Sequence, residues 1–133
     1  QAGVLNIKIK DYSNCIRNRN KLAKIYFREL NRIQQINLFK LSKENTHSFH
    51  QFVIRVDKRD QLMEYLKNKG IQTMVHYPYM LNELKFFKNS IRFKKSNFLG
   101  KKILSLPISE EHSIKEILYI TKKIKEFFDN KKN

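Results

Sequence analysis

The chain has 133 residues, of which 41% are hydrophobic, and a formal net charge of +16 at neutral pH. This length fits one domain with a hydrophobic core. The sequence contains no apolar run of about 18 residues, which a transmembrane helix requires, and no signal-peptide pattern. Cys15, the single cysteine, excludes an internal disulfide and a cysteine-based metal site and favours a cytoplasmic location.

The first part of the chain predicts one long helix followed by a loop. Six apolar residues up to position 33 recur near helical spacing; they are Ile16, Leu22, Ala23, Tyr26, Leu30 and Ile33. We expect a strand or an extended segment before this helix. Residues 31–46 are polar and mixed in character, and we expect them to form a loop with at most a short strand.

Residues 47–56 predict a strand, because Phe52, Ile54 and Val56 recur at every second position. This alternation places His50 on the same face as Phe52, so its imidazole is expected to be buried. His47 then faces the opposite side, and no third ligand is placed near it. We therefore expect no metal site at these two histidines.

The next element is a predicted helix over residues 58–69. Asp57 fits its N-cap, and Leu62, Met63 and Leu66 form an apolar stripe. Gly70 stands where a left-handed C-terminal cap is expected.

Residues 71–75 predict a second strand, which leads into the tripeptide His76-Tyr77-Pro78. Pro78 ends regular structure, because it lacks a backbone donor and fixes its own φ angle. A loop at a strand end is a rigid mount for polar side chains that bind a ligand. His76 and Tyr77 are therefore candidate binding residues; the alternative is that Tyr77 only packs against the domain.

Residues 79–97 predict no clear element, and a short helix is expected over residues 96–102. Basic residues here alternate with phenylalanines and no acid occurs between positions 85 and 102; the residues are Lys85, Phe86, Phe87, Lys88, Arg92, Phe93, Lys94, Lys95, Phe98, Lys101 and Lys102. Such a segment could neutralise and stack a nucleic-acid single strand. A solvated loop whose phenylalanines point into the core is the interpretation that we favour, and a small basic nucleic-acid-binding protein is the alternative.

The chain ends with a predicted strand, ILSLP at residues 103–107, and a predicted helix that begins at Ser109 or at Ser113, which forms a capping-box pattern with Glu116. This helix should bury Ile117, Ile120, Ile124, Phe127 and Phe128. Strands near positions 50, 73 and 104 predict an α+β fold, in which helices pack on one face of a small mixed or antiparallel sheet.

Three of these features, taken in order, resemble the DegT/DnrJ family of PLP-dependent nucleotide-sugar aminotransferases. They are the opening QAGVLNIKIK with the helix that follows, the strand–helix–strand unit that ends at His76-Tyr77-Pro78, and the strand ILSLP. The resemblance implies the C-terminal small domain of a fold-type I aminotransferase over residues 1–133. Residues 1–33 would be the interdomain helix region and residues 46–128 the α+β core, without the large PLP-binding domain.

The same resemblance implies a function for the complete enzyme. It would use PLP to move an amino group from an amino-acid donor to a keto-sugar nucleotide, as a homodimer, in surface-polysaccharide or amino-sugar biosynthesis. His76 and Tyr77 would line the sugar-nucleotide side of the active site. His50, near the domain interface, would be a third substrate-binding residue, which is the alternative to its burial in the core. Residues 79–82 lack the family's proline-rich turn and further histidine, so the resemblance does not extend to the outer substrate pocket.

The resemblance assigns no catalytic and no cofactor-binding residue to this chain, because the Schiff-base lysine belongs to the large domain. We therefore expect a fragment or truncated product that is inactive alone. The remnant of a decayed gene is a further alternative.

Overall fold

The computed structural model describes residues 2–42, 44–84, 86 and 93–130. The helices are α1 (Ala2–Lys8), η1 (Ile9–Asp11), α2 (Tyr12–Leu30), α3 (Arg59–Lys67), η2 (Leu81–Glu83), α4 (Lys94–Gly100) and α5 (Ile114–Asp129). The strands are β1 (Ile36–Leu38), β2 (Phe52–Val56) and β3 (Ile103–Leu106). None of the described helices combines the length and the apolar character that crossing a bilayer needs.

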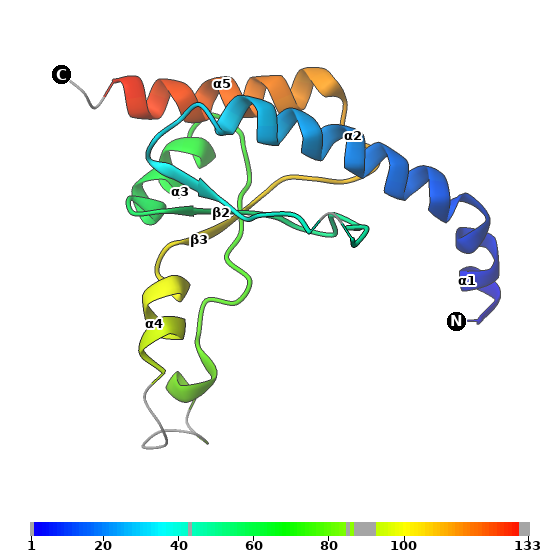
Figure 1. Cartoon of the computed structure of the whole chain (residues 1–133), viewed down its shortest axis with the longest axis horizontal. Coiled ribbons are helices and arrows are strands. Elements are labelled where there is room, and N and C mark those ends of the chain that lie inside the picture. Colours follow the sequence, from blue (N-terminus) through cyan, green and yellow to red (C-terminus); the bar gives the residue numbers. More distant parts are fainter. Residues whose placement is uncertain (1, 43, 85, 87–92, 131–133) are drawn as a thin grey trace.

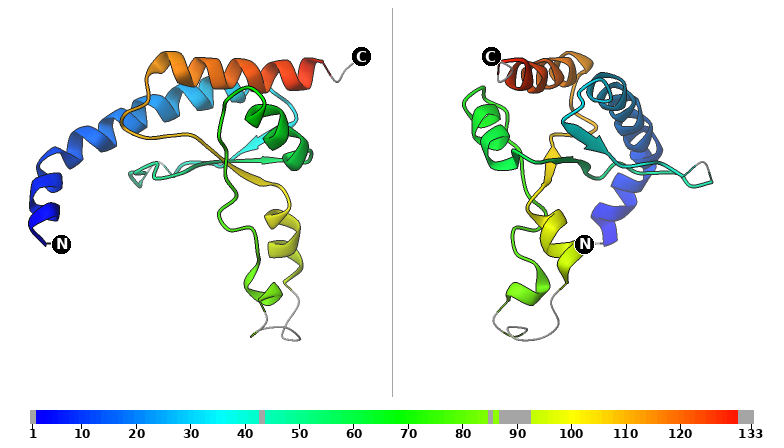
Figure 2. Two further views of the ribbon diagram at one scale, coloured as in Figure 1. Left: turned by 180° about the vertical axis from the view of Figure 1, so that it is seen from behind. Right: turned by 60° about the vertical axis from the view of Figure 1, so that its left-hand side comes forward.

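The described strands form one antiparallel sheet in the order β1-β2-β3. Its register pairs Ile36 with Val56 and Phe52 with Leu106. Helices α2 and α5 run side by side over one face of this sheet, with α3 next to them, while α4 extends away from the opposite side (Figures 1 and 2). This arrangement confirms the predicted α+β class with a small antiparallel sheet and helices packed on one face.

The core lies between the sheet and the helices α2, α3 and α5. Its largest fully buried side chains are Tyr26, Phe52, Leu30, Ile54, Leu62, Leu66, Leu104, Ile117, Ile124 and Val56. The ring of Tyr26 stacks on that of Phe52, with centroids 4.6 Å apart, and Phe27 meets Phe52 edge-on at 5.1 Å. Aromatic pairs in these geometries stabilise a core beyond the area that they bury.

Two local signals in the sequence are confirmed. Helix α5 begins after Ser113, whose Oγ accepts a hydrogen bond from the Glu116 backbone N–H (3.2 Å), while the Glu116 carboxylate accepts one from the Ser113 N–H (2.6 Å). This reciprocal capping selects Ser113 over Ser109 as the start of the helix. Gly70 adopts φ +75°, as a left-handed cap after α3 requires.

The predicted N-cap of α3 and the predicted extended opening are wrong. Asp57 forms an ion pair with Lys102 instead of capping α3, and Lys58 stands at the N-cap position without a side-chain hydrogen bond. Residues 2–8 form helix α1 rather than a strand.

The predicted strand over residues 71–75 is also wrong. This segment makes only an isolated antiparallel bridge, between Met74 and Ser105. Strand β2 begins at Phe52 rather than at His47, and the short strand allowed within residues 31–46 is β1. Helix α4 begins and ends two residues before the predicted range of 96–102.

The phenylalanines of the basic segment do not point into the core where the structure describes them. Phe86 is 97% exposed, Phe93 51% and Phe98 55%. The Lys102 ammonium lies 3.9 Å from the centre of the Phe98 ring, which forms a cation–π contact. Lys85, Phe87, Lys88 and Arg92 lie outside the described residues.

Candidate functional site

The site begins with His76, which β3 holds in place through Ser105. The backbone of Ser105 exchanges two hydrogen bonds with Met74, of 2.8 and 3.1 Å. The Ser105 hydroxyl lies 3.0 Å from His76 Nδ1, and Ser105 itself is only 7% exposed. One buried serine therefore fixes both the chain that leads to His76 and one nitrogen of its imidazole. In the described part of the chain no hydrogen bond reaches Nε2, which remains available to a ligand.

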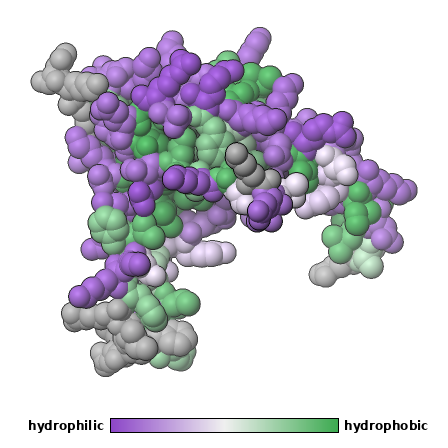
Figure 3. All heavy atoms as spheres, in the orientation of Figure 1, coloured by the Kyte–Doolittle hydropathy of each residue, from purple (hydrophilic) through white to green (hydrophobic). Residues whose placement is uncertain are grey.

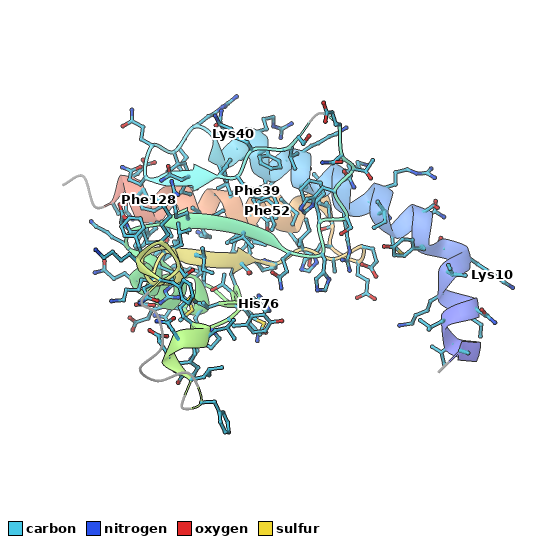
Figure 4. All side chains as sticks on the ribbon, turned by 60° about the horizontal axis from the view of Figure 1, so that its bottom comes forward. Lys10, Phe39, Lys40, Phe52, His76 and Phe128 are labelled. Carbon is cyan, nitrogen blue, oxygen red and sulfur yellow. The ribbon has the colours of Figure 1, made fainter. Side chains whose placement is uncertain are left out.

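His76 lines a cavity of about 530 Å³, which we call the histidine cavity because three of its lining residues are His50, His76 and His112. Its other walls come from the loop after α3, from the end of β3 and from the first turns of α5, and include Gln72, Ser105 and Tyr119. In Figure 4, His76 lies next to β3, away from Phe39 and Phe52. The structure thus brings together His50 and His76, which are far apart in the sequence.

Tyr77 does not line this cavity. Its side chain is 74% exposed, and its ring meets the His76 ring edge-on, with centroids 6.0 Å apart. The alternative that Tyr77 only packs against the domain is therefore wrong for this structure. Its phenol stands in solvent beside His76.

His50 is exposed, so the predicted core-facing imidazole is wrong. Phe49 takes the buried position instead, at 3% exposure, and adopts φ +47°. Its ring lies 6.4 Å from that of Phe52. This left-handed residue breaks the two-residue alternation just before β2 and turns His50 outward, toward the histidine cavity.

His50 also borders a second cavity, of about 550 Å³, on the sheet face that the helices leave open. Asn37 and Arg55 line it together with His47. His47 is held by a different contact, because its Nδ1 accepts a hydrogen bond from the Phe49 N–H (2.9 Å). His47 is absent from the lining of the histidine cavity.

His112 is the site residue that the sequence analysis missed. Its Nδ1 lies 2.6 Å from the Ser109 hydroxyl, within the turn that precedes α5. The Glu110 carboxylate of the same turn forms an ion pair with Arg19 of α2, at 2.7 Å. The Ser-x-x-His spacing before a helix cap is the signal in the sequence that could have indicated this residue.

Carboxylates at the edges of the site are held in their charged form. A hydrogen bond from its own backbone N–H, and next the Arg19 guanidinium, lower the pKa of the Glu110 carboxyl. Hydrogen bonds from the backbone and then from the hydroxyl of Ser113 lower the pKa of Glu116, which lines the histidine cavity.

The histidine cavity suits hydrogen bonding to a polar ligand. Imidazole, hydroxyl, amide and phenol groups and the Glu116 carboxylate line it beside apolar residues such as Ile71 and Leu106. In the part of the chain that the structure describes, neither a lysine nor an arginine lines it, so these lining residues do not fit the aldehyde and the phosphate of PLP. Among the described residues, no group of three or more His, Cys, Asp or Glu side chains could hold a metal ion.

Comparison with known proteins places this domain among aminotransferases. The model of the DegT/DnrJ/EryC1/StrS aminotransferase family matches residues 1–125. The chain is 35% identical, over 96% of its length, to the pleiotropic regulatory protein of Geobacillus stearothermophilus, of which it covers 36%. It is 29% identical, over 88% of its length, to the dTDP-3-amino-3,6-dideoxy-alpha-D-galactopyranose transaminase of Aneurinibacillus thermoaerophilus, of which it covers 32%.

Solved structures show the same fold. The crystal structure of S. venezuelae DesV in complex with a ketimine intermediate superposes with a TM-score of 0.90 at 24% identity, over 96% of this chain and 35% of that one. The chain thus spans about a third of the length of the curated relatives that it matches.

Proposed function

Because the chain belongs to the DegT/DnrJ/EryC1/StrS aminotransferase family, we propose that it acts as the C-terminal small domain of a nucleotide-sugar aminotransferase. Residues 1–33 form the interdomain helix region of this domain, and residues 46–128 form its α+β core, to whose sheet β1 adds one strand. The complete enzyme works in the cytoplasm as a homodimer and transfers an amino group from an amino-acid donor to a keto-sugar nucleotide. The alternative of a nucleic-acid-binding protein finds no support in the family match.

The role of this chain is to bind and orient the sugar nucleotide. The observation that carries this proposal is the His76–Ser105 pair at the wall of the histidine cavity. The pair holds the imidazole through Nδ1 and leaves Nε2 available to a ligand. An imidazole held in this way can donate a hydrogen bond to a diphosphate oxygen or a sugar hydroxyl. His50 adds a second imidazole to the same cavity, and Tyr77 presents an exposed phenol beside it.

PLP supplies the electron sink for transamination in such enzymes. Among the described residues neither a lysine nor an arginine lines the histidine cavity, so we assign the cofactor to the large domain of the complete enzyme. Helix α1 and the start of η1 form a suitable surface for that domain, because Val4, Leu5, Ile7 and Ile9 are each more than half exposed.

The four histidines of the chain test this proposal directly. We expect a nucleotide sugar such as a dTDP-hexose to shift the imidazole NMR signals of His50, His76 and His112. The signal of His47 serves as an internal control, because His47 does not line the cavity. The substitution His76→Gln should weaken binding by roughly tenfold, the loss of one charge-assisted hydrogen bond.

Two results would contradict the proposal. Equal shifts at all four histidines would indicate nonspecific association with a basic protein. A complete absence of shifts at millimolar ligand would mean that this domain contributes no binding of its own.

A further inference from the structure

Helices α2 and α5 carry seven basic residues on the surface that they turn away from the sheet. The basic residues of α2 follow one another at intervals of four, three and four positions, and those of α5 at intervals of seven and three. At such spacings the residues of each helix form one stripe along it. We call the two stripes together the basic face; its members are Arg17, Lys21, Lys24, Arg28, Lys115, Lys122 and Lys125, and all seven are exposed.

The two stripes share one surface because the other sides of both helices are occupied. Leu22 and Tyr26 of α2, and Ile117 and Ile124 of α5, are buried in the core. The C-terminal part of α2 runs beside α5, while its N-terminal part extends beyond the end of α5 (Figures 1 and 2). Figure 3 shows that hydrophilic side chains dominate the upper part of the molecule, where these helices lie.

Acidic residues do not neutralise this surface. Arg28 pairs with Glu29 at 2.7 Å, whereas the other six cations form no ion pair within the described parts of the chain. Glu126 of α5 forms an ion pair with Lys123, at 2.8 Å. Like charges three and four positions apart on a helix repel one another, so an anionic surface that neutralises them would bind favourably.

Apolar side chains beside the cations indicate which anionic surface fits. Ile114 is 38% and Leu118 39% exposed, at the start of α5 next to Lys115. The hydroxyl of Tyr119, also in α5, donates a hydrogen bond to the Lys69 carbonyl (3.3 Å), and the Lys123 ammonium lies 5.5 Å from the centre of its ring. Lysines flanking exposed aliphatic residues on a helix are typical of proteins that lie on an anionic bilayer.

We propose that the basic face docks this protein peripherally on a bilayer surface that carries anionic lipids. The inference goes beyond the proposed function and does not depend on it. None of the seven basic residues lines the histidine cavity.

Vesicle co-sedimentation tests the proposal. The chain should bind vesicles of phosphatidylcholine mixed with phosphatidylglycerol and not vesicles of phosphatidylcholine alone, and binding should weaken as salt rises. Each lysine near an anionic surface contributes a factor of about five to partitioning. The triple variant Lys21→Gln, Lys24→Gln, Lys122→Gln should therefore lower the partition coefficient roughly a hundredfold.

A matched triple variant on another surface supplies the control. Lys94, Lys95 and Lys101 are exposed and lie on or next to α4, so replacing them by Gln removes the same charge from a different place. This variant should bind almost as well as the unmodified chain, and circular dichroism should show that both variants are folded. Equal losses in the two triple variants, or no preference for phosphatidylglycerol, would overturn the inference.

Discussion

Replacing Tyr26 by Phe should remove one hydrogen bond and leave the packing of the ring intact. Tyr26 is completely buried, its hydroxyl donates to the Pro107 carbonyl at 2.7 Å, and its ring stacks on Phe52. A lost bond with its acceptor left unpaired costs about 1–3 kcal/mol. Because Pro107 is half-buried and water can partly reach its carbonyl, we expect the free energy of unfolding to fall by about 1–2 kcal/mol.

Urea denaturation followed by circular dichroism measures this change, and Tyr119→Phe is the matched control. The Tyr119 hydroxyl also donates to a backbone carbonyl, that of Lys69, but its side chain is 46% exposed. Its removal should cost less than about 0.5 kcal/mol, as is usual at the surface. If the two variants lose the same stability, the buried hydrogen bond does not contribute in the way that its geometry implies.

Alkaline pH provides an independent check on the same residue. Burial raises the pKa of the Tyr26 phenol well above its ordinary value. The unfolded chain therefore ionises this group from about pH 10 upward while the folded chain keeps it neutral. Stability should fall with rising pH in this range, and Tyr26→Phe should reduce the slope.

Three further predictions concern stability. Ser113→Ala should lower the free energy of unfolding, measured by urea denaturation, by about 1 kcal/mol, because it removes the cap of α5. The pKa of Glu116 is lowered in the folded chain, so the stability difference between the two proteins should shrink as the pH falls through about 4. A difference that does not change with pH would contradict the capping box. Gly70→Ala should cost about 1 kcal/mol in thermal unfolding, because φ is +75° while the space for a Cβ is open; a neutral effect would mean that the turn relaxes. Leu66→Ala should lower the free energy of unfolding by about 2–5 kcal/mol, because the Leu66 side chain is fully buried. The control Leu41→Ala, at an exposed position, should change it by less than about 0.5 kcal/mol. Equal losses of stability would refute the assignment of the core.

The sequence predicts most helices and the central strand because local chemistry decides them. Helix α5 carries both a capping box at Ser113 and a regular apolar stripe, and α3 is followed by Gly70 in the required conformation. The alternation around Ile54 identifies β2 in the same way. In each case the local preference and the tertiary packing agree.

The wrong predictions have tertiary causes. Residues 71–75 have the composition of a strand, but only Met74 meets the sheet, at Ser105, and sequence composition cannot show how much of a segment finds a partner. The orientation of His50 depends on the left-handed conformation of Phe49, which a non-glycine residue adopts only when surrounding contacts enforce it.

The histidine cavity was predicted only in part for the same reason. His76 is a candidate because of its position at a strand end and His50 because of the family resemblance, whereas their common cavity depends on how β2, β3 and α5 pack. His112 belongs to a turn in which Glu110 forms an ion pair with Arg19 of α2. Such contacts between distant parts of the chain have no local pattern in the sequence.

The pairing of α2 with α5 has a consequence for synthesis in the cell. Helix α2 ends at Leu30, whereas its packing partner begins only at Ile114. A ribosome that adds about 5–20 residues per second therefore leaves the apolar side of α2 without its neighbour for several seconds. During that interval the nascent chain is exposed to aggregation, and a chaperone that shields α2 until α5 has emerged should raise the yield of folded protein.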